Sequence, residues 1–392
     1  MPGPAWFGRN FSLEEVERFW GPIRLNRSEL LRRPVGLPAL RRCLHLRLIL
    51  DERCNLHCTY CYARQSRPRA MTPEVASRAI AVWRDLMEPG SQARSTVRFF
   101  GGEPMLNWLV MAQVLHELED SESPVLLNTN GTLLRSEHVD AFGRLNGRLQ
   151  VALSCDGVAE SHDAARRDST GRGTFEYVDA AAQLLAGARI PLCINAVIGV
   201  HNYQDLPRLA DYALLLRDRY QAPVSLGLEL VIPPPAPSFS TPIIDSCVQA
   251  VTQCLVHGLP VTGNLTYAFE ALLNAHGASG VFCGAVGAEL CVGPDGSVGH
   301  CPALPLLPFS DLETVAHLGE IPDPLSWRDR CAGNLPGCRG CEIEGLCGGG
   351  CAAQSYAACG NVFGTPPPLF CALIRRVFFT CLEHHLEARV CA

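Results

Sequence analysis

Short runs of apolar residues alternate along the chain with longer stretches in which apolar residues recur at helical spacing. The alternation begins near residue 44 and is typical of repeated β–α units built around a parallel sheet. Each short run has the length expected of a buried strand. The pattern therefore predicts an α/β protein with six strands, at Leu44–Leu50, Thr96–Phe100, Pro124–Asn128, Leu149–Ser154, Pro191–Ile198 and Val224–Ile232.

Helix signals fill the intervals between these strands. Thr72-Pro73 predicts the start of a helix, because threonine can cap a helix and proline fits its first position. A further helix is predicted over Phe175–Ala186 and is closed by Gly187. Nearer the N-terminus, the capping-box pattern Ser12-Leu-Glu-Glu15 predicts a short helix over residues 12–20.

A proline-rich tract, Pro233-Pro-Pro-Ala-Pro237, breaks the pattern because successive prolines join neither a sheet nor a helix interior. Beyond it, the spacing over Ile244–Leu255 predicts a core helix whose apolar face includes Cys247 and Cys254. The predicted order is an N-terminal helical extension, a barrel of β–α units, a helical linker, and a cysteine-rich domain with a C-terminal helix. These parts span residues 1–43, 44–235, 236–280 and 281–392.

Composition narrows the class of protein. Of the 392 residues, 47% are apolar and 18% charged, as in a globular protein. No apolar run approaches the ~18 residues of a membrane helix, and the N-terminus does not resemble a secretory signal. The net charge of −6 gives no broad basic field for nucleic acid. The 20 cysteines have metal-like spacings, which favour the reducing cytoplasm over a disulfide-bonded secreted protein.

The first set of spaced cysteines is Cys54-Asn-Leu-His-Cys58-Thr-Tyr-Cys61, directly after the first predicted strand. Three thiolates can hold three irons of a [4Fe–4S] cube, which otherwise takes four cysteines. One iron is then left for a ligand that is not protein. A structural zinc site is the alternative, but it needs four ligands and this loop supplies three.

The second set lies in the last third of the chain and contains eight cysteines. A hairpin turn, Pro294-Asp-Gly296, falls inside it, and its later part has the spacing C-x-x-C-x5-C-x3-C. Together with the first set, it accounts for 11 of the 20 cysteines and indicates ligands for three iron–sulfur clusters. Its members are Cys283, Cys291, Cys301, Cys338, Cys341, Cys347, Cys351 and Cys371.

The two sets, in this order, resemble the radical S-adenosylmethionine (radical SAM) enzymes that carry a C-terminal SPASM extension, over residues 44–375. The resemblance implies a partial (β/α)6 TIM-like barrel and an S-adenosylmethionine molecule on the open iron, cleaved to a 5′-deoxyadenosyl radical. It also implies two auxiliary [4Fe–4S] clusters with crossed ligands. One would be held by Cys283, Cys291, Cys301 and Cys351, and the other by Cys338, Cys341, Cys347 and Cys371.

Other segments resemble the family's cofactor-binding motifs. By that match, Tyr60 would pack near the adenine, and Gly101, Gly102 and Glu103 of Phe99-Phe-Gly-Gly-Glu-Pro104 would bind the methionyl amino group. Ser154 would contact the ribose and Arg166 the cofactor carboxylate. The ordinary alternatives are a glycine turn, a helix cap and a solvated arginine. Asn128-Thr-Asn-Gly131 also ends a strand, where turn chemistry is sufficient to explain it.

Two ligand assignments stay open. Leu290-Cys-Val292 also has the pattern of a short strand, in which Cys291 would simply pack, and Cys359 could replace Cys371 because it too lies beyond Cys351. The other nine cysteines are predicted to pack as small apolar residues. They are Cys43, Cys155, Cys193, Cys247, Cys254, Cys331, Cys359, Cys381 and Cys391.

The resemblance implies an oxidoreductase that abstracts hydrogen from a ribosomally made peptide and installs a crosslink or another oxidative modification. Sulfatase or quinone-cofactor maturation is the alternative, and Pro302 weakens the sulfatase reading because that subfamily has an Asp after the cysteine matching Cys301. A non-catalytic metal-binding or electron-transfer scaffold is the alternative of another class. The expected partners are a peptide or protein substrate, a flavodoxin or ferredoxin as electron donor, and a separate leader-peptide-binding protein; no nucleic acid or membrane is expected.

Overall fold

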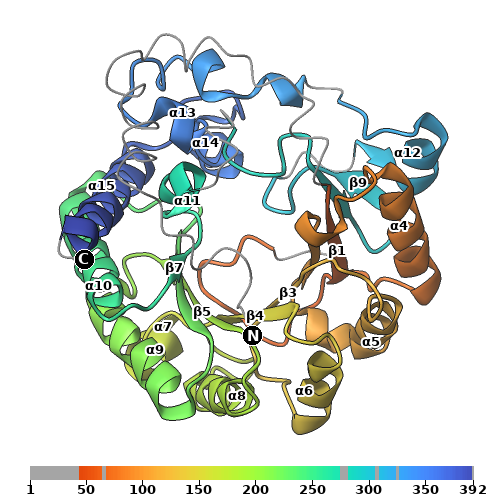
Figure 1. Cartoon of the computed structure of the whole chain (residues 1–392), viewed down its shortest axis with the longest axis horizontal. Coiled ribbons are helices and arrows are strands. Elements are labelled where there is room, and N and C mark those ends of the chain that lie inside the picture. Colours follow the sequence, from red (N-terminus) through yellow and green to blue (C-terminus); the bar gives the residue numbers. More distant parts are fainter. Residues whose placement is uncertain (1–43, 64–67, 274–280, 305–308, 324–325, 391–392) are drawn as a thin grey trace.

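The computed structural model describes residues 44–63, 68–273, 281–304, 309–323 and 326–390, with only the backbone described for 386–390. Its centre is one ten-stranded sheet in the order β10-β9-β8-β1-β2-β3-β4-β5-β6-β7. Figure 1 shows this sheet curved into a ring, with helices on its outside. The sheet does not close, because β10 and β7 remain its two edges.

Six parallel strands form the barrel wall, and each matches a predicted strand to within two residues. Neighbouring strands pair in parallel from β1 to β6. The α/β class and the six predicted strands are confirmed. The strands are β1 (His45–Asp51), β2 (Val97–Gly101), β3 (Val125–Thr129), β4 (Leu149–Ser154), β5 (Leu192–Ile198) and β6 (Val224–Leu230).

The helices of the barrel cover the outside of these strands. Thr72 caps the first of them, since its side chain accepts a hydrogen bond from the Val75 amide, as predicted. The predicted closure by Gly187 is wrong: Gly187 lies inside its helix, and the positive φ of 57° falls at Arg189. The helices are α4 (Pro73–Leu86), α5 (Trp108–Glu117), α6 (Ser136–Gly143), α7 (Ala159–Ala165), α8 (Phe175–Gly187) and α9 (Leu206–Tyr220), with 3-10 turns η1 (Gln92–Arg94), η2 (Pro104–Asn107) and η3 (Tyr203–Asp205).

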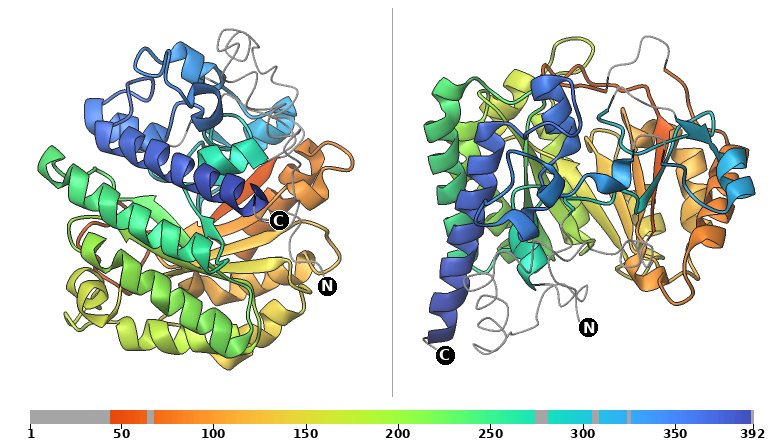
Figure 2. Two further views of the ribbon diagram at one scale, coloured as in Figure 1. Left: turned by 60° about the vertical axis from the view of Figure 1, so that its left-hand side comes forward. Right: turned by 90° about the horizontal axis from the view of Figure 1, so that it is seen from above.

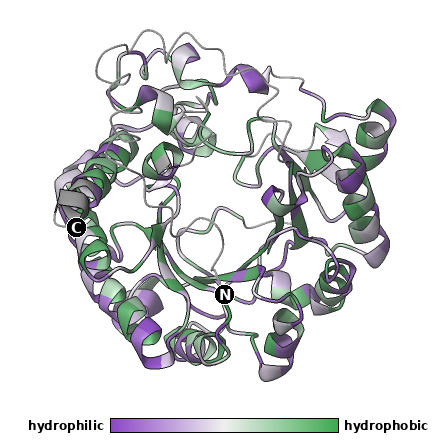
Figure 3. Ribbon diagram, in the orientation of Figure 1, coloured by the Kyte–Doolittle hydropathy of each residue, from purple (hydrophilic) through white to green (hydrophobic). Residues whose placement is uncertain are grey.

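Alternation along each strand separates the hydrophobic core from the inside of the ring. In β1, Leu46 and Leu48 are fully buried and belong to the main core, whereas Arg47 between them is half-buried. Successive side chains of a strand point to opposite faces, so Arg47 faces the interior of the ring. Figure 3 shows the strands as largely hydrophobic and the outer faces of the helices as more hydrophilic.

The region predicted as a helical linker extends the barrel wall. Its long helix packs against α9, and the short strand β7 pairs in parallel with β6. Cys247 and Cys254 are fully buried on that helix, as predicted. The elements are η4 (Pro237–Phe239), α10 (Ser240–Val256), β7 (Val261–Thr262) and α11 (Tyr267–Leu273).

The C-terminal region lies across the open side of the ring, as Figures 1 and 2 show. Strand β8 pairs in parallel with β1, and β9 and β10 follow it antiparallel. The last helix lies beside α10. The elements are β8 (Glu289–Val292), β9 (Ser297–Gly299), β10 (Ser310–Asp311), α12 (Leu312–Leu318), η5 (Trp327–Asp329), η6 (Ala332–Asn334), α13 (Glu344–Cys347), α14 (Ala352–Cys359) and α15 (Pro368–Val390).

Two further expectations concern the N-terminal extension and membrane-spanning helices. The helix predicted over residues 12–20, and the extension 1–43 that contains it, lie outside the described residues. Across the described part of the chain, every helix is too short or too polar to cross a membrane.

Candidate cofactor and cluster site

The first cysteine loop runs from the end of β1 over the carboxyl ends of the neighbouring strands. Burial is the main cause that raises the pKa of Cys54 to about 11, and the charges of Cys58 and Cys61 add to it. The pKa of Cys58 is raised too, by burial and by Cys61. The three thiols therefore lie within electrostatic reach of one another.

The end of β2 is joined to the start of this loop through glycines. The amide of Gly102 donates to the Asp51 carbonyl and that of Glu103 to the Arg53 carbonyl, both at 2.8 Å. A Cβ on Gly101 would lie 2.2 Å from the Asp51 oxygen, and one on Gly102 would lie 2.4 Å from the Arg53 oxygen. The close approach that these glycines allow is made to the backbone of the cysteine loop.

Glu103 is buried and fixes the loop that follows β3. Its carboxylate accepts hydrogen bonds from the Met105 amide (2.9 Å), the Thr129 hydroxyl (2.7 Å) and the Asn130 amide (2.8 Å). Burial raises the pKa of Glu103 to about 7, against the effect of these hydrogen bonds. The side chain thus organises the strand ends, and its contact with a cofactor stays a prediction.

Asn130 belongs to the segment Asn128-Thr-Asn-Gly131, which the sequence explained as turn chemistry without a role at the site. Its side-chain amide donates to the Asn55 side chain at 2.9 Å and lies 3.9 Å from the Cys54 sulfur. Asn55 in turn donates to the Thr132 hydroxyl at 2.8 Å. The turn expected after β3 is present, since Asn130 accepts from the Thr132 amide at 3.0 Å. Its position at a strand end was the signal that could have identified it.

On the opposite side of the loop, Arg166 and Tyr60 meet at Asp156. Arg166 is 7% exposed, and its Nε lies 2.8 Å from the Asp156 carboxylate. The NH1 of Arg166 lies 3.9 Å from the Cys58 sulfur. Tyr60 donates its hydroxyl to Asp156 and stacks on His201 at 4.9 Å. Ser154 ends β4, two residues before Asp156.

Three cysteines of the second set gather inside the ring. Burial raises the pKa of Cys283 to about 11, with the charge of Cys351 next in effect. The pKa of Cys301 is raised well above its ordinary value by burial, with Cys351 and Cys283 adding to the effect and Arg47 opposing it. These thiols form one group beside the Arg47 side chain.

Cys291 lies in β8, in register with Arg47 of β1 and Gly299 of β9. It is 3% exposed, and burial raises its pKa to about 12. The charges that act on it are those of Arg47 and Glu289. Arg47 acts on both Cys291 and Cys301, so the two thiols share one positive neighbour. The strand reading of residues 290–292 is confirmed, and ligation by Cys291 stays a prediction.

The other four cysteines of the second set form a separate group. Burial raises the pKa of Cys347 to about 12, and the charges of Cys371, Cys338 and Cys341 add to it. Cys359 is exposed, and its thiol donates to the Ser355 carbonyl at 3.2 Å. The structure therefore brings Cys371, and not Cys359, to this group.

The remaining cysteines divide by burial. The five in the hydrophobic interior are Cys155, Cys193, Cys247, Cys254 and Cys381, as expected of packing residues. Cys331 is partly buried. Cys43 and Cys391 lie outside the described residues.

The radical SAM superfamily profile matches residues 48–213, which contain the first cysteine loop and five of the barrel strands. The chain contains a radical SAM domain. The scaffold alternative is thereby set aside. Its fold is that of SPASM-containing radical SAM enzymes, as two solved structures show. One is anSMEcpe with bound AdoMet and Cp18Cys peptide, with a TM-score of 0.68, 20% identity, and coverage of 88% of this chain and 98% of that one.

The second structure is Streptococcus suis SuiB bound to S-adenosylmethionine, with a TM-score of 0.61, 15% identity, and coverage of 91% and 86%. Among curated relatives, the radical SAM cyclopropyl synthase TigE of Paramaledivibacter caminithermalis is 22% identical over 81% of this chain and 69% of its own. The PqqA peptide cyclase of Ruegeria pomeroyi is 25% identical over 81% and 84%. An AdoMet-dependent heme synthase of Methanosarcina barkeri is 26% identical over 81% and 93%.

A radical SAM domain implies a [4Fe–4S] cluster and S-adenosylmethionine, and the residues of the first loop fit them. Among the described residues, no three Cys, His, Asp or Glu side chains converge on a single metal ion. A cube takes each thiolate on a different iron, so Cys54, Cys58 and Cys61 suit a cluster better than one zinc ion. Bound there, the cluster supplies the electron that cleaves the cofactor.

Tyr62 lies between the radical SAM loop and the thiol group inside the ring. It follows Cys61 directly, and the residue is 46% exposed. Its pKa is raised first by desolvation of the hydroxyl and then by the charge of Cys301, with Cys61 adding a smaller effect. Both thiols therefore act on the pKa of the phenol in the same direction.

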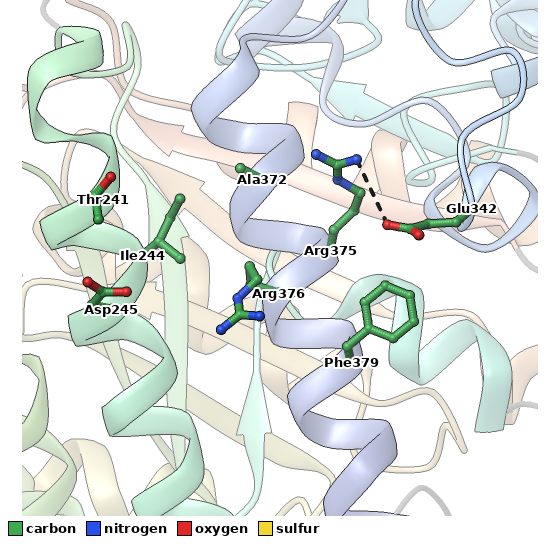
Figure 4. A pocket seen from close by; sticks show the side chains of 8 residues that line it. All are labelled: Thr241, Ile244, Asp245, Glu342, Ala372, Arg375, Arg376 and Phe379. Carbon is green, nitrogen blue, oxygen red and sulfur yellow. Dashed lines mark ion pairs between the residues drawn. The ribbon is translucent and has the colours of Figure 1, made fainter.

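A groove of about 570 Å³ lies elsewhere, between α10 and α15 on the outside of the ring (Figure 4). Arg375 and Glu342 approach each other across it at 3.9 Å. Its lining contains none of the predicted cofactor contacts of the radical SAM domain. The lining residues are Thr241, Ile244, Asp245, Glu342, Ala372, Arg375, Arg376 and Phe379.

Proposed function

We propose that this radical SAM enzyme abstracts hydrogen from a ribosomally made peptide and installs a crosslink or another oxidative modification. The observation that carries the proposal is the pairing of β8 with β1, which places Cys291 beside Arg47 inside the same ring as the cysteine loop that follows β1. A peptide segment in this space would lie between the site of radical formation and an acceptor for the remaining electron. The peptide-bound anSMEcpe structure and the PqqA peptide cyclase support a peptide substrate.

We also propose two auxiliary [4Fe–4S] clusters, which makes three clusters in all. Cys283, Cys301 and Cys351 would hold the inner one with Cys291 as the fourth ligand. Hydrogen abstraction leaves a substrate radical. Formation of a crosslink or a double bond from this radical then releases one electron and one proton. The inner cluster would take up that electron. The outer cluster, held by Cys338, Cys341, Cys347 and Cys371, would carry it toward the surface.

The remaining partners belong to the same proposal. A flavodoxin or ferredoxin would reduce the first cluster, and a separate protein would present the leader of the peptide. Reduced thiols and oxygen-sensitive clusters fit the cytoplasm, where glutathione keeps cysteines reduced.

Sulfatase maturation is the second candidate, because a cysteine-type anaerobic sulfatase-maturating enzyme of Clostridium perfringens is 28% identical over 41% of this chain and 45% of its own. Cys301 is followed by Pro302, which has no acidic group to serve as a base. The heme synthase among the relatives shows that similar sequences are also named for substrates that are not peptides. A peptide substrate and a substrate that is not a peptide differ in which molecule loses the abstracted hydrogen.

The test uses the reconstituted, reduced protein with S-adenosylmethionine and two synthetic peptides. One is the product of a short reading frame encoded beside this chain, and the other is the Cp18Cys peptide named with anSMEcpe. We expect the unlabelled first peptide to lose two hydrogen atoms by mass spectrometry, and the same peptide deuterated at carbon to pass deuterium to 5′-deoxyadenosine.

The variant Cys54→Ala with Cys58→Ala and Cys61→Ala is the control for adventitious iron. Modification of the Cp18Cys peptide alone would assign the protein to sulfatase maturation. Steady formation of 5′-deoxyadenosine without a mass change in either peptide would contradict a peptide substrate.

A further inference from the structure

Asp156 accepts several hydrogen bonds beside the radical SAM loop, although the loop itself does not contain it. It is 0% exposed. Its two oxygens accept hydrogen bonds from Arg166, from the Val197 amide at 3.0 Å and from the Tyr60 hydroxyl. Nε2 of His201 lies 3.6 Å away. Donors from the cysteine loop, the end of α7 and β5 therefore meet at one side chain that follows β4.

A buried carboxylate is stable only when its charge is compensated. Burial alone would raise the pKa of Asp156, but the Arg166 guanidinium and the hydrogen bonds from Arg166 and Tyr60 hold it well below its usual range. Asp156 is therefore an anion at neutral pH. Arg166 is its counter-charge, and Asp156 likewise holds the pKa of Arg166 well above its ordinary value although burial opposes this.

The contact between Asp156 and Arg166 uses two of the three guanidinium nitrogens. Nε of Arg166 lies 2.8 Å from Oδ2 of Asp156, and NH2 lies 3.3 Å from Oδ1. This is the two-pronged contact that the planar guanidinium favours with a carboxylate. The remaining nitrogen, NH1, lies 3.9 Å from the Cys58 sulfur. The guanidinium also lies over the Tyr60 ring at 5.5 Å, so its plane is fixed from a second side.

We propose that Asp156 is a positioning residue of the cofactor site, which acts through Arg166. By holding the Nε–NH2 edge, it turns NH1 toward Cys58 and toward the cofactor carboxylate expected at the open iron. Without Asp156, the charge of Arg166 and its contact with the Tyr60 ring would remain, but the Nε–NH2 edge would lose the partner that orients it. Residues that orient a direct ligand contribute substantially to affinity in metal sites. The inference concerns the cofactor and holds for any substrate.

A double-mutant cycle tests this dependence. S-adenosylmethionine is titrated into reconstituted wild type, Asp156→Asn, Arg166→Gln and the double variant, and binding is followed by the change in the electron paramagnetic resonance signal of the reduced first cluster. We expect Arg166→Gln to weaken binding by about 10- to 150-fold and Asp156→Asn by roughly 3- to 30-fold. The double variant should bind no more weakly than Arg166→Gln alone if Asp156 acts through Arg166, whereas a further loss in the double variant would assign part of its effect to another contact such as Tyr60.

Arg208→Gln is the matched control, since Arg208 pairs with Asp205 at 3.1 Å on the surface. It should leave the affinity unchanged. Iron content and the absorbance of each variant are measured first. Losses that multiply in the double variant would show that Asp156 acts on the cofactor independently and would overturn the proposal.

Arg166→Lys provides a second test, which holds even if Asp156→Asn does not assemble its cluster. Lysine keeps the positive charge but cannot bind Asp156 with two nitrogens while a third points elsewhere. We expect Arg166→Lys to bind the cofactor nearly as weakly as Arg166→Gln, with an unchanged signal from the cluster before the cofactor is added. Wild-type affinity in Arg166→Lys would show that charge alone suffices, and orientation by Asp156 would be excluded.

Discussion

The radical SAM loop and the C-terminal cysteine domain both gather thiols, but the protein supports them in different ways. The loop rests on the ends of regular strands. Gly102 and Glu103, which follow β2, bond to the Asp51 and Arg53 carbonyls just before the loop, and Asn130 after β3 bonds to its Asn55 side chain. Each of these partners follows a strand of a sheet with a continuous hydrophobic core. The loop is therefore placed before any iron binds.

The C-terminal domain has little regular structure around its thiols. Cys347 and Cys351 are joined by three glycines, Gly348, Gly349 and Gly350, which all have positive φ (66°, 87° and 67°). A Cβ on Gly348 would lie 2.2 Å from the Val281 backbone, so only glycine fits there. Short helices and turns bury less apolar surface than the barrel. We expect the proposed auxiliary clusters to stabilise this domain, whereas the barrel is stabilised by its hydrophobic core.

The largest expected effect concerns activity alone. Replacing Cys54, Cys58 and Cys61 together with Ala should abolish cleavage of S-adenosylmethionine, because no protein ligand is left for the first cluster. The barrel should keep its fold, since its hydrogen bonds and core are untouched. Formation of 5′-deoxyadenosine under anaerobic reducing conditions and the circular dichroism spectrum measure the two outcomes. Continued 5′-deoxyadenosine formation would show that these cysteines do not hold the first cluster. Loss of the barrel's circular dichroism signal would show that the barrel depends on this cluster for stability.

The second prediction reverses the test. Replacing Cys338 and Cys347 with Ser should remove the outer cluster and expose the backbone of residues 326–360 to solvent, while β1 to β6 stay protected. Hydrogen exchange followed by mass spectrometry distinguishes the two regions. Cys359→Ser is the matched control, because Cys359 is an exposed thiol of the same domain and lies apart from both groups. Equal loss of protection in the Cys359 variant would show that the exposure is not specific to loss of the proposed ligands.

The same contrast explains what the sequence could reveal. The six barrel strands were predictable because buried parallel strands leave continuous apolar runs. The cysteine sets were predictable because metal spacing is local. Strand β8 was suggested only by residues 290–292, and its pairing with β1 joins residues more than 240 positions apart, which no local pattern encodes.

The side-chain networks were harder to foresee for the same reason. Asp156 stands in the quoted segment Leu153-Ser-Cys-Asp-Gly157, where it was read as part of a motif and not as the partner of Arg166. Asn130 was read as turn chemistry. The contacts of Asp156 and Asn130 depend on which strand ends become neighbours in the folded barrel. Gly101 and Gly102 were expected to approach a ligand, and the structure shows that their first contact is the cysteine loop.

The third prediction concerns the polar anchor of the C-terminal domain. Arg330 is 1% exposed and donates to the carbonyls of Val362 (2.6 Å), Gly350 (2.8 Å) and Gly349 (3.2 Å). Arg330→Met keeps the volume but leaves these carbonyls without a donor, which should lower the free energy of unfolding by about 2–5 kcal/mol. Denaturant unfolding of the holoprotein measures it. Arg339→Met, at an exposed residue of the same domain, should cost much less; similar losses in both would show that Arg330 is not an anchor.

The smallest expected effect is at Cys291, where the two kinds of support meet. It lies in a regular strand, yet it shares the Arg47 side chain with Cys301 of the inner thiol group. Cys291→Ala should change the fold little, because alanine fits the buried strand position. If Cys291 is the fourth ligand, the change opens one iron of the inner cluster and shifts its reduction potential, since ligand identity tunes the cluster. The measurement is spectroscopy of the auxiliary clusters in the variant that lacks the first cluster, with and without Cys291. Identical signals would show that Cys291 packs as a strand residue, and the inner cluster would then keep an iron open to a substrate thiolate.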